Sequence, residues 1–131
     1  MFFPPDLASV RAARLWAAES VRAHGATPAA ERLVVLLASE LVTNAVKYGP
    51  PSGSIDVDAR YADGAVRIAV RDDSPRVPVV IDAPPEATGG RGMKLIDTFA
   101  AAWGVEADGG GGKTVWFQVD LATDGPRIAR A

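Results

Sequence analysis

The sequence predicts an α+β domain, a two-layer α/β sandwich in which a mixed, mostly antiparallel sheet carries its helices on one face. Two patterns support this prediction. Apolar residues recur at helical spacing in the first 50 residues, and from residue 53 onward they alternate with polar residues as in strands. The length supports one domain over residues 1–131, because 131 residues of which 48% are apolar suffice for one core and are too few for two.

Two helices are expected in the first part of the chain. One covers about residues 7–23, between the candidate N-cap Asp6 and a C-terminal Gly25. Its apolar stripe is Leu7, Val10, Ala13, Ala17 and Val21. The other begins after the candidate N-cap Thr27 and ends at Gly49. Its expected core face is Val34, Leu37, Ala38, Leu41 and Ala45.

Four strands with alternating apolar and polar residues follow. They are expected at about residues 55–60, 66–71, 103–107 and 114–121. The first two are joined by a hairpin turn at Asp63-Gly64. The last two are joined by the glycine run 109–112, which we interpret as a hairpin loop. A phosphate-binding P-loop is rejected there, because Ala107 stands where that motif needs glycine and a strand follows in place of a helix.

Three other segments complete the chain. The proline-rich residues 74–91 form a loop long enough to suggest a lid. A short helix is expected at about residues 92–100. Residues 122–131 are expected to be a flexible tail, which leaves a core of about residues 5–121.

The composition excludes several kinds of function. The 14 Lys and Arg nearly balance the 16 Asp and Glu and are scattered along the chain, which argues against direct nucleic-acid binding. The absence of cysteine excludes disulfides and thiolate metal sites, and the single His24 excludes multi-histidine metal sites. No apolar run approaches the ~20 residues of a membrane span and no signal peptide is evident, so we expect a cytoplasmic protein with no membrane contact.

Three polar residues of the second helix are candidates for chemistry. Glu40, Asn44 and Lys47 are spaced i, i+4 and i+7, which places them on one stripe away from the leucine face. A carboxylate and an amide one turn apart can hold a hydrated Mg²⁺, and the carboxylate can act as a general base. The alternative is a solvated helix face.

Two further positions are candidates for ligand binding. Asp72 ends a predicted strand, where its carboxylate can accept a hydrogen bond from an exocyclic amine such as that of adenine; the alternative is an ordinary turn aspartate. The glycine-rich residues 88–93 lead into a short helix, whose exposed N–H groups favour phosphate; the alternative is a hinge without a ligand.

In their order along the chain, these pieces resemble one family. An E-L-V-x-N-A helix, a V-x-D strand end, a G-x-G-M segment and a terminal G-K-T-V-W-F strand span about residues 5–121. The combination resembles the histidine-kinase-like ATPase (GHKL, Bergerat-fold) superfamily, and in particular its short stand-alone ATPases of the anti-sigma regulatory factor and serine-protein kinase type. The resemblance implies the Bergerat ATP-binding fold, with ATP and Mg²⁺ as cofactors.

The resemblance also assigns roles to individual residues. It implies that Glu40 is the catalytic carboxylate and that Asn44 is the Mg²⁺-binding amide. Asp72 matches the aspartate that recognises adenine; two and four residues later the family has glycines, where this chain has Ser74 and Arg76. The expected ATP-binding residues are Asn44, Lys47, Asp72, Ser74, Gly90, Arg91, Gly92, Met93 and Thr114. Of these, Lys47 and residues 90–93 are expected near the phosphates and Thr114 near adenine.

Two functions from different classes follow from the resemblance. The first is an ATP-dependent serine/threonine kinase that acts on a protein antagonist within anti-sigma regulation. The alternative is a non-catalytic, nucleotide-responsive module that sequesters a sigma factor or another regulator. A scaffold that has lost nucleotide binding is a third, weaker alternative. Because the N-terminal edge strand contributes to dimer contacts in relatives, and here is reduced to Met1–Phe3, a homodimer remains open.

Overall fold

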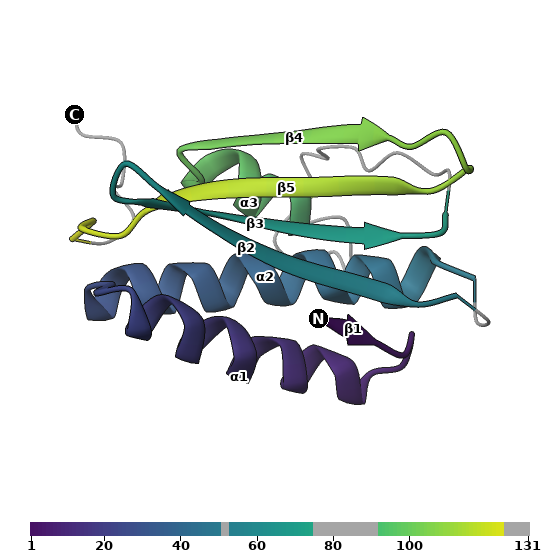
Figure 1. The fold of residues 1–131 in the computed structure, drawn as a ribbon, viewed down its shortest axis with the longest axis horizontal. Helices are drawn as coiled ribbons and strands as arrows, with labels where there is room; N and C mark the ends of the chain where they lie inside the picture. The colour runs from purple at the N-terminus through teal and green to yellow at the C-terminus, as the bar shows by residue number, and fades with distance from the viewer. Residues whose placement is uncertain (51–52, 75–91, 125–131) are drawn as a thin grey trace.

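Helices cover one face of an antiparallel sheet in this protein (Figure 1). The computed structural model describes residues 1–50, 53–74 and 92–124. The elements are β1 (Phe2–Phe3), α1 (Ala8–Ala23), α2 (Pro28–Tyr48), β2 (Ile55–Ala62), β3 (Ala65–Asp72), α3 (Gly92–Phe99), β4 (Ala102–Ala107) and β5 (Lys113–Asp120). Within these residues the strand order is β1-β2-β3-β5-β4, and every pair is antiparallel. The predicted α+β sandwich is confirmed, with no parallel pair in this part of the sheet.

The central helix α2 begins and packs as predicted. The Thr27 side chain accepts a hydrogen bond from the Ala30 N–H at 3.0 Å, which satisfies one of the free N–H groups of the first turn. The predicted core face is confirmed, because Val34, Leu37 and Ala38 have no exposed surface and the other two members are at most 3% exposed. This helix therefore forms the centre of the helical layer, between α1 and α3.

The first helix differs from the prediction at its start. It begins at Ala8, and the Asp6 carboxylate accepts a hydrogen bond from the Ser9 N–H at 3.2 Å. Leu7 was expected in the core but is 71% exposed. That prediction is wrong because Leu7 precedes the first helical residue and does not belong to the buried stripe. The stripe runs at intervals of four through Ser9, Ala13, Ala17 and Val21.

The hairpin between β2 and β3 sets the register of the sheet. Asp63 and Gly64 both have positive φ, at 53° and 75°, as a tight type I′ turn requires. Ala62 pairs with Ala65 across the turn, and from there the apolar residues of both strands fall on the face that meets the helices. The predicted alternation is confirmed by the buried residues Ile55, Val57, Val66, Ile68 and Val70.

The pairing of β3 with β5 determines which side chains share a face. The ladder runs from Ala65 opposite Asp120 to Asp72 opposite Lys113. Since side chains alternate along a strand, Asp72 and Lys113 face the helices, and their neighbours Arg71 and Thr114 face the other side. The last pair of this ladder is thus an acid and a base on the covered face.

The remaining predictions concern the loops and the end of the chain. The glycine run before β5 is a hairpin loop as predicted, in which Asp108 accepts hydrogen bonds from the N–H groups of Gly110 and Gly112. At the start of the expected tail, the Thr123 carbonyl accepts a hydrogen bond from the Thr27 hydroxyl. Residues 75–91 of the expected lid and residues 125–131 of the tail lie outside the described residues.

Candidate functional site

The predicted polar stripe of α2 meets the start of α3. A Cβ atom added at Gly92 would lie 2.8 Å from Oε2 of Glu40 and 3.5 Å from Nδ2 of Asn44. Only glycine lets the first residue of α3 approach these two side chains so closely. The structure therefore brings Glu40, Asn44 and Gly92 together from two elements that are far apart in the sequence.

The Glu40 carboxyl is half-buried at this contact. Burial raises its pKa above the ordinary value of a glutamate, and the positive charge of Lys47 opposes this with a smaller effect. A carboxylate with a raised pKa is a stronger proton acceptor than an ordinary glutamate. Lys47 itself is exposed, and its ammonium lies 5.5 Å from the centre of the Tyr48 ring. Its predicted contact with phosphate stays a prediction.

A second polar cluster lies at the end of β3. The Lys113 ammonium donates hydrogen bonds to both oxygens of Asp72 at 2.9 Å, and the Ser74 N–H donates to Oδ1 at 2.8 Å. The Asp72 and Lys113 residues are only 4% and 6% exposed. Removing both charges from water is costly, and here their ion pair and the backbone hydrogen bond compensate for that cost.

The two clusters lie along the same helix. A Cβ atom at Gly49, the C-cap residue that follows α2, would lie 3.8 Å from the Cβ of Asp72. Asn44 precedes Gly49 by five residues, which is ~7.5 Å along a helix axis. Glu40 and Asn44 thus lie along α2, and Asp72 lies beside its C-terminal end.

The hairpin before β5 holds Lys113 in place. Arg71 pairs with Asp108 at 2.7 Å and with Asp73 at 2.9 Å, so one guanidinium joins the end of β3 to this loop. Hydrogen bonds from the Gly110 N–H, from Arg71 and from the Gly112 N–H lower the pKa of Asp108. The loop is therefore tied to the residues on either side of Asp72.

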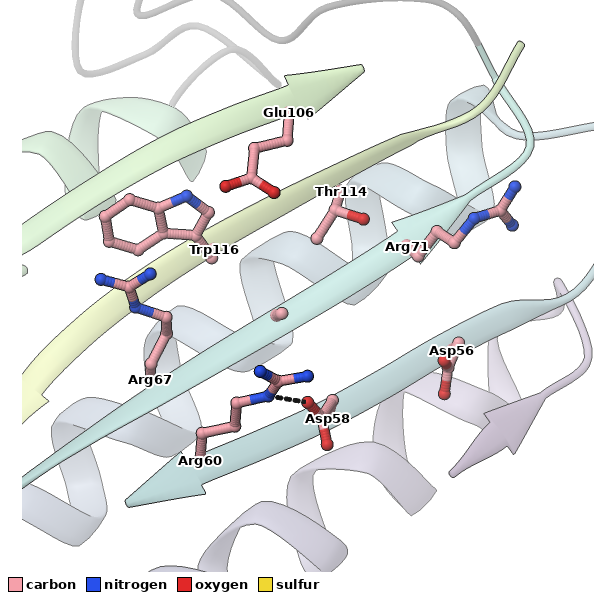
Figure 2. Close-up of a pocket in the computed structure, with 9 residues that line it drawn as sticks. Asp56, Asp58, Arg60, Arg67, Arg71, Glu106, Thr114 and Trp116 are labelled. Carbon is pink, nitrogen blue, oxygen red and sulfur yellow. Dashed lines mark hydrogen bonds and ion pairs between the residues drawn. The ribbon is translucent and has the colours of Figure 1, made fainter. Parts of the chain in front are cut away.

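Thr114 does not join this site. Its side chain points to the uncovered face of the sheet, toward a shallow groove of about 360 Å³ that Arg71, Glu106 and Trp116 also line (Figure 2). On the same face the Arg67 guanidinium lies 3.8 Å from the centre of the Trp116 ring. Thr114 was expected near adenine, but the strand alternation turns its side chain to the face opposite that of Asp72, so its role in ATP binding stays a prediction.

Lys113, which was not among the expected binding residues, lies opposite Asp72. The signal was present in the sequence, since Lys113 has the same parity as the buried Val115 and Phe117. The strand begins at Lys113, one residue before its expected start, so Lys113 stood outside the expected strand.

The glycine-rich segment is described only in part. Gly90 and Arg91 lie outside the described residues, as does Arg76. Gly92 is at the Glu40–Asn44 contact, and the Met93 side chain is 3% exposed within the core. Among the described residues there is no group of three or more acidic, His or Cys side chains suited to hold a metal. None of the helices described is both long and apolar enough to cross a membrane.

Comparison with known proteins places this geometry in a family. The sequence model of the histidine kinase-like ATPase domain matches residues 3–119, and the chain belongs to this family. Over 48 residues it is 44% identical to an uncharacterized protein of Streptomyces coelicolor; this match covers 35% of the chain and 46% of that protein.

Solved structures share the fold. The RsbU and RsbW domains of Rv1364c from Mycobacterium tuberculosis match with a TM-score of 0.69 and 19% identity, over 98% of this chain and 34% of that one. The catalytic domain of the histidine kinase ThkA matches with a TM-score of 0.58 and 18% identity, over 93% and 95%. A mycobacterial sensor histidine kinase, MprB, matches with a TM-score of 0.55 and 15% identity, over 93% and 99%. The chain thus spans about a third of the Rv1364c structure and under half of the Streptomyces protein.

Proposed function

We propose that this protein binds ATP and acts as an anti-sigma-type regulator, transferring the γ-phosphoryl group of Mg²⁺-ATP to a serine or threonine of a protein antagonist. The observation that carries the proposal is the contact of Glu40 and Asn44 with Gly92, in a chain of the histidine kinase-like ATPase family. The RsbW domain among the structural matches supports the regulatory part of the proposal.

The residues at this contact fit ATP and Mg²⁺. Mg²⁺ prefers oxygen ligands, of which the Asn44 amide would supply one, and it commonly keeps several waters. The missing side chain at Gly92 leaves room beside both groups, at a helix start whose N–H groups favour phosphate. When bound, Mg²⁺ neutralises negative charge on the phosphates. Asp72, beside the C-terminal end of α2, would accept a hydrogen bond from the adenine amine.

The proposed chemistry needs one proton acceptor and accurate positioning. The partner's hydroxyl oxygen forms a bond to the γ-phosphorus, while the bond from that phosphorus to the bridging oxygen breaks and ADP leaves. Glu40 takes the hydroxyl proton, and the burial that raises its pKa makes it better suited to do so. Phosphoryl transfer otherwise depends mostly on alignment and charge stabilisation.

The second candidate is a module that binds nucleotide without catalysis and sequesters a sigma factor or another regulator. The observation that favours it is the state of Asp72, whose two oxygens are already bound by Lys113 and the Ser74 N–H. Such a site would bind nucleotide more weakly and respond to its concentration. A cytoplasmic location and a homodimer both stay predictions.

The test separates binding from transfer. Wild type and Glu40→Gln are compared by calorimetry with ATP and Mg²⁺, and by transfer of label from γ-labelled ATP to proteins of a cell extract. We expect similar ATP affinity and strongly reduced labelling in the variant. Binding of ATP by wild type without transfer would select the second candidate. No binding of wild type at millimolar ATP would contradict both.

A further inference from the structure

The buried pair of Asp72 and Lys113 has hydrogen-bonding capacity left over. A carboxylate offers about four lone-pair sites and an ammonium group three N–H donors. Asp72 Oδ1 accepts from the Ser74 N–H and from Lys113, and Oδ2 accepts from Lys113 alone. Within the described residues, the pair therefore keeps one acceptor site on Oδ2 and one donor on the Lys113 ammonium, side by side.

We propose that Lys113 donates a hydrogen bond to N1 of adenine, the ring nitrogen next to the amine, while Asp72 accepts a hydrogen bond from the amine itself. This inference rests on the proposed ATP binding and names the residue that completes base recognition. The Lys113 ammonium can donate to N1 of adenine, which accepts. The neighbouring Asp72 oxygen can accept from the N6 amine, which donates. Lys113 would thus be a specificity-determining residue of the site.

The depth of the pair selects N1 over N7, the other ring nitrogen beside the amine. Asp72 and Lys113 are 4% and 6% exposed, so only the part of a base farthest from its ribose would reach them. In adenine that part is the six-membered ring, with N1 and the amine at its edge. N7 lies in the other ring, which carries the ribose.

The Asp72–Lys113 pair is also held firmly enough to distinguish a base that has the N1 acceptor from one that lacks it. The register of β3 and β5 places the two residues directly opposite each other, and the Ser74 N–H fixes the carboxylate. The Arg71–Asp108 ion pair ties the loop that precedes Lys113 to the end of β3. A donor fixed in this way forms a strong, charge-assisted hydrogen bond with N1, and a base that lacks an acceptor at this position cannot form that bond.

The experiment compares three ligands on the full chain. Dissociation constants are measured by calorimetry for ATP, for 1-deaza-ATP, which lacks the N1 acceptor, and for 7-deaza-ATP, which keeps it. We expect wild type to bind 1-deaza-ATP roughly ten- to a hundredfold more weakly than ATP, the range for a hydrogen bond from a charged donor. It should bind 7-deaza-ATP as well as ATP.

Two variants then assign the effect to Lys113. In Lys113→Met the preference for ATP over 1-deaza-ATP should disappear. The matched control Lys94→Met, in the exposed part of α3, should keep the wild-type preference. If Lys113→Met does not fold, the wild-type comparison of the three ligands decides alone.

The contrary outcomes are distinct. Equal wild-type binding of ATP and 1-deaza-ATP would overturn the role of Lys113 and leave the proposed function intact. The role of Lys113 would also be overturned if wild type lost more affinity with 7-deaza-ATP than with 1-deaza-ATP. The same holds if Lys113→Met still bound 1-deaza-ATP more weakly than ATP. If wild type binds none of the three ligands, the proposed function itself fails.

Discussion

Gly92→Ala is the substitution that tests the α2–α3 contact most specifically. The new Cβ would lie 2.8 Å from Oε2 of Glu40, where ordinary van der Waals contact begins at 3.4 Å. The difference of these two distances is 0.6 Å, which is the least displacement that the carboxylate must undergo. Since Oε2 ends a flexible side chain, the displacement should cost little stability. A helical alanine is also favoured over glycine by up to about 1 kcal/mol.

The effect on phosphoryl transfer should be much larger than the effect on stability. Misplacing a reacting group by about 1 Å can reduce a rate by ~100-fold, so we expect transfer by Gly92→Ala to fall roughly ten- to a hundredfold. Thermal unfolding should show little change in Tm. The assay is the rate of label transfer from γ-labelled ATP at saturating concentration.

A control variant and a double variant make the result specific. Gly109→Ala is the matched control, because a Cβ there would meet nothing within 4 Å. It should transfer at the wild-type rate. In a Glu40→Gln background, Gly92→Ala should cause no further loss if it acts through Glu40. Full activity of Gly92→Ala, or an equal fractional loss in both backgrounds, would refute the reasoning.

Three further predictions concern stability. Phe117→Ala removes a fully buried ring and should lower the free energy of unfolding by about 3–5 kcal/mol in urea denaturation; an unchanged midpoint would contradict its place in the core. Thr27→Ala removes the cap of α2 and its bond to Thr123, and should cost about 1 kcal/mol in the same measurement, whereas wild-type stability would show that the cap contributes nothing. Glu40→Gln should stabilise the protein at pH 7, because a raised pKa in the folded state means that ionising Glu40 opposes folding. This gain should shrink as the pH falls through the raised pKa of Glu40 and should be lost below the ordinary glutamate value of 4.5, and a gain that does not depend on pH would exclude burial of the charge as its cause.

Local patterns predicted those parts of the fold that depend on neighbours in the sequence. The Thr27 cap and the Asp63-Gly64 turn were found because each acts on backbone groups within a few residues. The core face of α2 was found because helical periodicity alone determines which residues share a face. The prediction for Leu7 was wrong because periodicity does not fix where a helix starts, and α1 begins one residue after Leu7.

The site depended more on tertiary contacts. The spacing of Glu40 and Asn44 placed them on one face, but their contact with Gly92 comes from packing between α2 and α3. Thr114 and Lys113 show the limit most clearly. Alternation along β5 determines the face that each of them takes, whereas the register of β5 against β3 determines that Lys113 lies opposite Asp72.

The most direct test of the account is a calorimetric titration of the purified protein with ATP, with and without Mg²⁺. Asn44→Ala and Asp72→Asn, which alter the two polar clusters, are titrated in parallel. The account predicts binding that Mg²⁺ strengthens in wild type, loss of this Mg²⁺ effect in Asn44→Ala, and weaker binding in Asp72→Asn. Folded wild-type protein that releases no heat at millimolar ATP, or variants that bind as wild type does, would contradict it.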